Sequence, residues 1–262
     1  CALPISGFKA GITVNINGSN ISPVTVLDQG RITFTSPALS SATYTIYASN
    51  TDGATAIYVP GLVYSGLPTW SSPTAGSIGT SYETKSVSTL NYTSFSATGD
   101  APITYSILSG SLPSGVTLSS SGTLSGTLPV TSSPTTYSFT IRATDAQLQD
   151  SDRAFSLTIN PDLITWVAPT QNGSLTVYET QAFSTPLSAT SAAGYGVMYA
   201  ANTLPTGITL SNNTGAFTGY ANTVGVTGVQ LTATANTTGR YATSNVNFVV
   251  NQDVVTWSSP AN

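Results

Sequence analysis

The fold of this chain is decided by the stretch Leu112-Pro113-Ser114-Gly115-Val116-Thr117-Leu118-Ser119, which is followed by Gly122-Thr123-Leu124-Ser125-Gly126. The pattern returns as Leu204-Pro205-Thr206-Gly207-Ile208-Thr209-Leu210-Ser211, followed by Gly215-Ala216-Phe217-Thr218-Gly219. The proline favours a turn, the glycine supplies a positive φ, and a short β run then ends at a glycine-bounded corner. Two copies of the pattern predict two copies of one β module, with Leu118 and Leu210 at equivalent, buried positions.

A second repeat gives the length of the module. The sequence Thr69-Trp70-Ser71-Ser72-Pro73 recurs as Thr165-Trp166-Val167-Ala168-Pro169, and a third start appears at Thr256-Trp257-Ser258-Ser259-Pro260. Consecutive tryptophans are therefore 96 and 91 residues apart. This spacing matches an immunoglobulin-like sandwich of roughly 100 residues and is far too long for a solenoid repeat or a propeller blade.

The composition favours an all-β chain. Only 6% of the residues are charged, against roughly 25% in typical soluble domains. Thr and Tyr, which favour strands, and Gly, Asn and Pro, which favour turns, are abundant instead. We therefore expect an all-β fold of tandem immunoglobulin-like β-sandwiches, arranged as beads on a string. The expected units are 1–65, 66–161, 162–252 and the truncated start of a further repeat at 253–262.

The charge and the cysteine content argue against several classes of function. With a net charge of −4 and no basic patch, nucleic-acid binding is disfavoured. No apolar run approaches the roughly 18 residues of a transmembrane segment, so we expect no membrane span. The single cysteine, Cys1, cannot form a disulfide within the chain. Cys1 fits a processed lipoprotein terminus or, as we favour, a sequencing artefact, because Cys1-Ala2-Leu3-Pro4-Ile5 is also encoded by a string found in sequencing adapters.

The first unit contains short alternating strand patterns that end at turn residues. Its motifs resemble the IPT/TIG family of immunoglobulin-like domains. The matching motifs are G-x-x-x-G-x-x-V-x-I-x-G at Gly7 to Gly18, I-T-F-T-x-P at Ile32 to Pro37, Y-T-I-x-x-x-N-x-D-G at Tyr44 to Gly53, and the closing Tyr64. The family's first strand is missing, so the resemblance implies an N-terminally truncated domain over residues 1–65.

The two repeated modules resemble the putative-Ig (He-PIG) family, a cadherin-like branch of the immunoglobulin-like sandwiches. The motifs L-P-x-G-h-T-L-S and G-x-h-[ST]-G, in which h is apolar, carry the resemblance together with the strand from Tyr137 to Asp145. The resemblance covers about Leu67 to Asn251, and the second copy places Asn236 where the first has Asp145. The opening T-W-x-x-P followed by G-S-h also resembles arrays in structural proteins of marine tailed phages.

The chain offers little to an enzyme. It contains no histidine, which excludes histidine-ligated zinc sites and histidine-based triads and general bases. A carboxylate pair, as in glycosidases, is the remaining option. Glu83 and Glu179 share the same Y-E-T context in their modules, and equivalent residues in repeated modules are more often structural than catalytic. We therefore expect no enzymatic activity.

The resemblance to cadherin-like modules implies calcium at module junctions, where carboxylates and carbonyls would supply six to eight oxygens. The candidate ligands are Glu83, Asp145, Asp162 and Glu179, with Asp150, Asp152 and Asp253 as further acidic residues. The alternative is that these are solvated turn residues. No D-x-D-x-D loop is present, and an asparagine replaces an acid in the second copy. We therefore expect no bound cofactor, with calcium as the alternative, and a melting temperature that EDTA leaves nearly unchanged.

These observations favour a non-enzymatic spacer or adhesion module of a larger protein, either a phage tail or fibre protein or a bacterial cell-surface protein. Its partners would be other domains or subunits of that protein, and its location the virion surface or the outside of the bacterial cell. One alternative is a carbohydrate- or receptor-binding module that holds a surface glycan or receptor with exposed loop aromatics. Another is a calcium-stiffened, cadherin-like adhesion rod. Trp70, Trp166 and Trp257 each open a module beside a proline, and we expect them to pack at the module edge rather than to stack on sugars.

Overall fold

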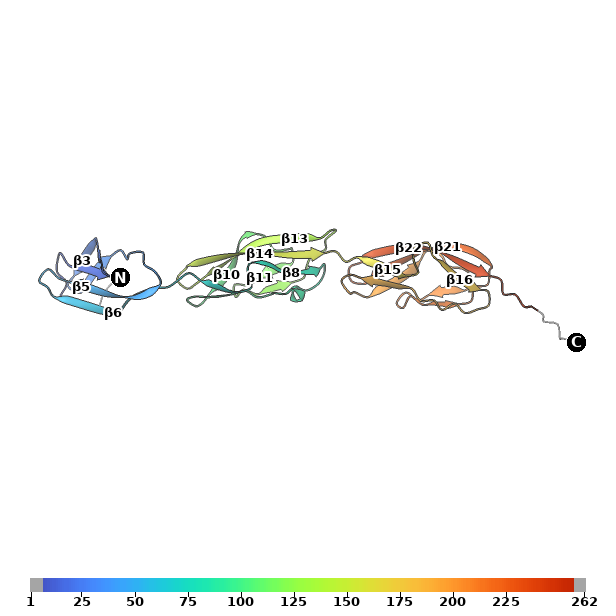
Figure 1. The fold of residues 1–262 in the computed structure, drawn as a ribbon, viewed down its shortest axis with the longest axis horizontal. Helices are drawn as coiled ribbons and strands as arrows, with labels where there is room; N and C mark the ends of the chain where they lie inside the picture. Colours follow the sequence, from blue (N-terminus) through green and yellow to red (C-terminus); the bar gives the residue numbers. More distant parts are fainter. Residues whose placement is uncertain (1–6, 257–262) are drawn as a thin grey trace.

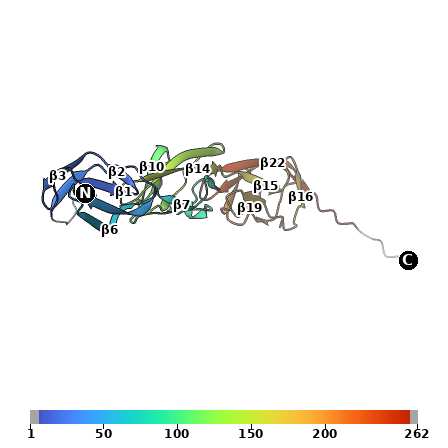
Figure 2. The same cartoon turned by 60° about the vertical axis from the view of Figure 1, so that its left-hand side comes forward.

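The structure, a computed structural model, describes residues 7–256. Three β-sandwich modules follow one another in single file, as Figure 1 and the turned view of Figure 2 both show. The one helical segment in this part of the chain is the short 3-10 helix η1 (Val87–Thr89), and no helix there is long and apolar enough to cross a membrane. The all-β tandem fold is thereby confirmed. The expectations for Cys1 and for most of the repeat at 253–262 lie outside the described residues.

The first module combines a four-stranded sheet with a two-stranded one. Its strands are β1 (Thr13–Ile16), β2 (Ser19–Ile21), β3 (Val24–Asp28), β4 (Arg31–Phe34), β5 (Ala42–Ser49) and β6 (Thr55–Tyr64). The larger sheet has the order β2-β1-β5-β6, and β3 pairs with β4. In β1, Val14 and Ile16 are fully buried while Thr13 is exposed, which is the alternation of a half-buried strand. They pack with Ile32 and Ile46 in a core that belongs to this module alone.

The second module has its own core and a larger set of strands. They are β7 (Thr69–Ser72), β8 (Gly76–Tyr82), β9 (Ser96–Thr98), β10 (Thr104–Gly110), β11 (Val116–Leu118), β12 (Leu124–Gly126), β13 (Thr135–Thr144) and β14 (Asp150–Asn160). The main sheet has the order β10-β13-β14-β8, while β7 pairs with β9 and β11 with β12. β8 runs parallel to β14, and the other pairs are antiparallel. Every second side chain is buried from Phe139 to Ala143 in β13 and from Phe155 to Ile159 in β14.

The third module repeats this arrangement strand for strand. Its strands are β15 (Ile164–Ala168), β16 (Ser174–Tyr178), β17 (Ser188–Ser191), β18 (Val197–Ala201), β19 (Ile208–Leu210), β20 (Phe217–Gly219), β21 (Gly225–Ala235) and β22 (Tyr241–Asn251). The sheet order β16-β22-β21-β18 and the pairs β15-β17 and β19-β20 match those of the second module. The parallel pair recurs as β16 beside β22. The repeated motif therefore does mark two copies of one module.

The strand of the repeated motif corrects one expectation about the core. Leu118 and Leu210 are equivalent, because each is the last residue of its strand and pairs with the first residue of the next one. Both are only half-buried, whereas Val116 and Ile208 are 7% and 6% exposed. All four side chains point to the core face, but the leucines lie at the strand ends, where the core stops.

The hairpin between the two long strands differs in length between the modules. In the second module the Asp145 N–H donates to the Gln149 carbonyl (3.0 Å), whereas in the third the Ala235 N–H donates to the Arg240 carbonyl (2.8 Å). The turn of the third module is thus one residue longer, and the strand registers agree with this. Asp145 therefore corresponds to Ala235, and the expectation that Asn236 takes its place was wrong by one residue.

The tryptophans that open the modules pack inside them. Trp70 is 8% exposed, and its Nε1 donates to the Ser151 carbonyl (3.2 Å). Trp166 makes the matching bond to the Ala242 carbonyl (3.2 Å). The expected packing of Trp70 and Trp166 against their modules is confirmed, while Trp257 lies outside the described residues.

Candidate functional site at the junction of the second and third modules

Two segments that leave the second module meet where the third module begins. β8 and β14 are parallel neighbours, with Tyr82 opposite Asn160 at their ends. Glu83 and Asp162, which follow these strands, are therefore brought together. The Glu83 N–H donates to the Asn160 carbonyl (2.9 Å), and the Asp162 N–H donates to Oε1 of Glu83 (3.0 Å). The Y-E-T sequence and the N-P-D linker thus form one site.

Glu83 has no exposed side-chain surface, and donors surround its carboxylate. Oε1 accepts hydrogen bonds from the Asp162 N–H (3.0 Å) and from Nε of Arg240 (2.8 Å). Oε2 accepts from the Thr131 N–H (2.9 Å) and from Nη2 of Arg240 (3.0 Å). The two parallel hydrogen bonds from the Arg240 guanidinium fix the relative orientation of the two side chains, and its positive charge compensates the negative charge of the Glu83 carboxylate. This ion pair joins the second module to the third.

Arg240 reaches the junction from the hairpin between β21 and β22. Its side chain is 34% exposed, and its Nη2 also donates to the Thr131 carbonyl. Burial raises the pKa of Glu83, but the hydrogen bonds from Arg240, Thr131 and Asp162 outweigh this effect, so the pKa lies below its ordinary value. The hydrogen bond to Glu83 raises the pKa of Arg240 above its ordinary value. Both groups are therefore charged at neutral pH.

Asp162 holds the linker to the third module. This residue is 1% exposed. Oδ1 accepts from the Ser191 hydroxyl (2.6 Å) and from the Ala193 N–H (3.0 Å), and Oδ2 accepts from the Thr238 hydroxyl (2.9 Å). All three donors belong to the third module, whereas the Asp162 N–H binds Glu83 of the second. Asp162 is therefore hydrogen-bonded to both the second and the third module.

An aromatic contact flanks the ion pair. The hydroxyl groups of Thr84 and Tyr195 form a hydrogen bond (2.8 Å) between the modules. Nζ of Lys85 lies 4.1 Å from the centroid of the Tyr195 ring, which is the geometry of a cation–π interaction. The junction thus combines ionic, hydrogen-bonding and aromatic contacts.

The structure separates the calcium candidates into three places. Glu83 and Asp162 meet at the junction. Asp145 lies at the opposite end of the second module, where its Oδ1 accepts from the N–H groups of Gln147 and Gln149 (2.9 Å each), and Glu179 lies at the far end of the third module. Asp150 and Asp152 both form ion pairs with Arg142.

The junction does not fit a calcium ion. A calcium site needs six to eight oxygen ligands, and both carboxylate oxygens of Glu83 already accept hydrogen bonds from an arginine and from backbone N–H groups. A guanidinium stands where a cation would have to approach this carboxylate. Within residues 7–256, no three acidic, cysteine or histidine side chains form a group able to hold a metal.

Arg240 was not among the residues predicted from the sequence. The one sequence signal is that Arg240 is the single basic residue between 162 and 252, which makes it the only basic side chain of that module available to a carboxylate. The partner lies 157 residues away, however, and no local pattern connects the two. The acidic half of the site could be predicted, but the basic half could not.

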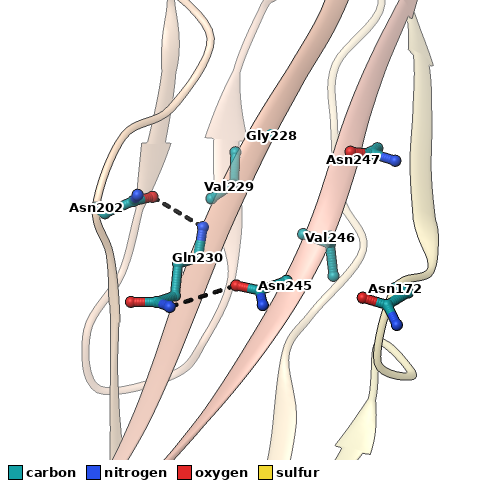
Figure 3. A pocket seen from close by; sticks show the side chains of 8 residues that line it. All are labelled: Asn172, Asn202, Gly228, Val229, Gln230, Asn245, Val246 and Asn247. Atoms are coloured by element: carbon teal, nitrogen blue, oxygen red, sulfur yellow. Dashed lines mark hydrogen bonds between the residues drawn. The ribbon is translucent and has the colours of Figure 1, made fainter.

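A second candidate site is a shallow hollow on the main sheet of the third module. Its volume is about 370 Å³, and five amide side chains line it: Asn172, Asn202, Gln230, Asn245 and Asn247. Figure 3 shows three of them joined across the strands, where Oδ1 of Asn202 accepts from the Gln230 N–H (2.8 Å) and Nε2 of Gln230 donates to Oδ1 of Asn245 (3.4 Å). This surface can donate and accept hydrogen bonds but carries no charge.

The lowered pKa of Glu83 predicts how the junction responds to acid. A carboxyl group whose folded-state pKa is depressed contributes stability above its unfolded pKa and loses it as the pH falls through the folded value. We expect the contribution of Glu83 to be complete at neutral pH and to disappear below its ordinary value of 4.5. Urea unfolding at a series of pH values checks this. Glu83→Gln should flatten the acid limb, and an unchanged acid limb in that variant would contradict the assignment.

Comparisons with known proteins follow the same modules. The family model described as Putative Ig domain matches the chain twice, over residues 68–160 and 165–251. Drosophila N-cadherin EC1-4 is 14% identical, with a TM-score of 0.31 over 94% of this chain and 69% of that one. Mouse cadherin-23 EC22-24 is 14% identical (TM-score 0.32; 92% and 86%). An endo-fucoidan hydrolase of glycoside hydrolase family 107 is 16% identical (TM-score 0.33; 97% and 43%). No curated protein matches the sequence.

Proposed function

This chain belongs to the putative Ig domain family, and from that membership we propose that it is a non-enzymatic spacer of a larger surface or fibre protein. In this proposal the second and third modules form one stiff segment that holds a distal part at a distance. The main support for a stiff spacer is the ion pair between Glu83 and Arg240 of the next module. The Glu83 side chain has no exposed surface.

The junction resists bending because opening it breaks several charge-assisted bonds at once. Hydrogen bonds to charged groups contribute roughly 1.5–3 kcal/mol each. Arg240 makes two such bonds to Glu83, and Asp162 accepts three more from the third module. These bonds join the second module and the linker to the third module, so moving the modules apart breaks several of them.

The same contacts favour a structural role over catalysis. Acid–base chemistry by carboxylates needs a pair that faces a substrate. Glu83 and Asp162 are buried and hydrogen-bonded within the protein, and Asp150 and Asp152 face Arg142. The chain contains no histidine to take their place.

Small-angle X-ray scattering in EDTA tests the spacer proposal. We expect a rod-like particle, with a pair-distance distribution that matches the single-file arrangement of Figure 1. The Arg240→Met variant should scatter as a more flexible particle of shorter average length. Wild-type protein that already scatters as freely jointed beads would overturn the proposal.

Metal removal gives a separate prediction. Because the junction is closed by a guanidinium, EDTA and millimolar CaCl₂ should give nearly the same melting temperature. A ligand that binds only the folded state would stabilise it by about 2.7 kcal/mol at a hundredfold excess over its dissociation constant, so a thermal melt detects such binding easily. A calcium-dependent rise of many degrees would instead support a calcium-stiffened rod.

The setting of the spacer is also part of the proposal. We propose that the first module is an IPT/TIG-like domain, and that the parent protein is exposed on a virion or on a bacterial surface. A chain with 6% charged residues, rich in Ser, Thr and Asn, supports this. The neighbourhood of the gene tests it. Capsid and tail genes would place the protein on a virion, and a secretion signal would place it on a cell. If neither is found, both proposed locations are contradicted.

The amide-lined hollow supports a second candidate function, the binding of a neutral polysaccharide. Carboxamides both donate and accept hydrogen bonds, as sugar hydroxyl groups do. A glycan array tests this candidate. Binding that is lost in the Asn245→Ala/Asn247→Ala variant and kept in Asn91→Ala, an exposed asparagine of another module, would support it. An array without signal would remove it.

A further inference from the structure

The far end of the third module repeats part of the acidic half of the junction. Glu179 follows β16 as Glu83 follows β8. The Glu179 N–H donates to the Asn251 carbonyl (2.9 Å), just as the Glu83 N–H donates to the Asn160 carbonyl (2.9 Å). The backbone therefore places the two glutamates equivalently.

Asp253 extends this likeness. It lies two residues after the end of β22, as Asp162 lies two residues after the end of β14, and the Thr180 hydroxyl donates to its Oδ2 (3.1 Å). The acidic residues of the two half-sites differ in solvent exposure. Glu83 and Asp162 are 0% and 1% exposed, whereas Glu179 is half-exposed and Asp253 is exposed.

The residue at one hairpin position differs between the two junctions together with the first residue of the linker. At the second junction the linker begins with Asp162, and the hairpin supplies Arg240. At the first junction Gly66 stands in the position of Asp162, since Gly66-Leu67-Pro68-Thr69-Trp70 aligns with Asp162-Leu163-Ile164-Thr165-Trp166. The hairpin position of Arg240 is there occupied by Gln149, whose Nε2 donates to the Ser65 carbonyl (3.3 Å) and hydroxyl (3.1 Å). Arg240 thus pairs with Glu83 where the linker begins with an acid, and Gln149 binds Ser65 where the linker begins with a neutral residue.

We propose that Glu179, Thr180 and Asp253 form a docking surface for a further module of this family, and that this partner presents an arginine at the hairpin position of Arg240. The inference rests on the proposed spacer function, which it extends by one junction. The sequence supports the occupant, because Asp253-Val254-Val255-Thr256-Trp257 repeats the linker Asp162-Leu163-Ile164-Thr165-Trp166. A guanidinium can satisfy such carboxylates with paired bonds, whereas two carboxylates fall short of the six to eight oxygens of a calcium site.

The test extends the chain after Gln252 with a second copy of residues 162–252. Asp162 of the added copy then takes the place of Asp253, and its Arg240 can reach Glu179. One spin label is attached at Gln230→Cys of the original third module and the other at Thr243→Cys of the added copy, in a chain that also carries Cys1→Ser. Double electron–electron resonance in EDTA then measures the distance between the labels across the new junction. We expect one narrow distance peak. It should be lost with Glu179→Gln or with Arg240→Gln in the added copy, and restored when the two charges are exchanged.

Controls separate the outcomes. In the unextended chain Glu179→Gln should leave the melting temperature unchanged, and a large loss there would show that Glu179 serves its own module and would overturn the proposal. A narrow peak in every variant, or in none, would also overturn it. The same measurement across the second junction, with Glu83→Gln, shows whether the spacer function fails as well. A calcium-induced rise in melting temperature that Glu179→Gln abolishes would make the surface a cation site instead.

Discussion

Replacing Arg240 with methionine is expected to lower the free energy of unfolding by about 3–5 kcal/mol, the range for removing one partner of a buried ion pair. The variant leaves the Glu83 carboxylate, which has no exposed surface, with only two backbone donors. Glu83→Gln should cost less, because Arg240 is a third exposed and can turn to water. Urea unfolding at pH 7 measures both changes.

A double-mutant cycle separates the ion pair from other effects of the substitutions. Replacing Glu83 and Arg240 together by methionine should cost less than the sum of the single changes, because neither charge is then left alone. Arg31→Met is the matched control: Arg31 pairs with Asp28 on the surface, with 63% and 48% of the side chains exposed, and should change stability by less than about 1 kcal/mol. Equal losses for Arg31→Met and Arg240→Met would refute the importance of the junction.

The second large effect concerns the motif that defines the module. Gly126 has a φ of +118°, and a Cβ added there would lie 2.0 Å from the carbonyl oxygen of Gly115. Gly126→Ala should therefore cost about 2–5 kcal/mol, combining left-handed strain with backbone displacement. The equivalent pair Gly219 and Gly207 has the same 2.0 Å approach, so Gly219→Ala should behave alike. Thermal unfolding of each variant measures these losses.

Gly76 provides the control for this prediction. It lies in the same module with a φ of +113°, but a Cβ added there would meet nothing within 4 Å. Gly76→Ala therefore isolates the cost of the backbone conformation, about 1–2 kcal/mol. If Gly76→Ala and Gly126→Ala destabilise equally, the close approach to Gly115 has no energetic role.

Local patterns were sufficient to predict the fold. Alternation of apolar and polar residues in strands such as Tyr137 to Asp145, and turn residues between them, carry information about immediate neighbours. The repeated motif extends that information to a second copy. The burial of Leu118 was predicted wrongly. Alternation indicates on which face of the sheet a side chain lies, but it does not indicate where along the strand the core ends.

The candidate site was predictable only in part. Glu83 and Asp162 each stand at the end of a strand, so they could be named, and the parallel pairing of β8 with β14 then brings them together. Arg240 depends on how two modules are oriented, which no local pattern specifies. The extra residue in its hairpin also shifted the match of Asp145 from Ala235 to Asn236.

We propose that the Glu83–Arg240 pair holds the second and third modules as one stiff segment without a metal. The most direct test of this proposal is the distance between spin labels at Ser138→Cys and Thr243→Cys, two exposed strand positions on either side of the junction. In EDTA, with Cys1→Ser, we expect one narrow distance peak that calcium leaves unchanged and that Arg240→Met broadens. A broad distribution in EDTA that narrows only when calcium is added would contradict a metal-free, stiff junction.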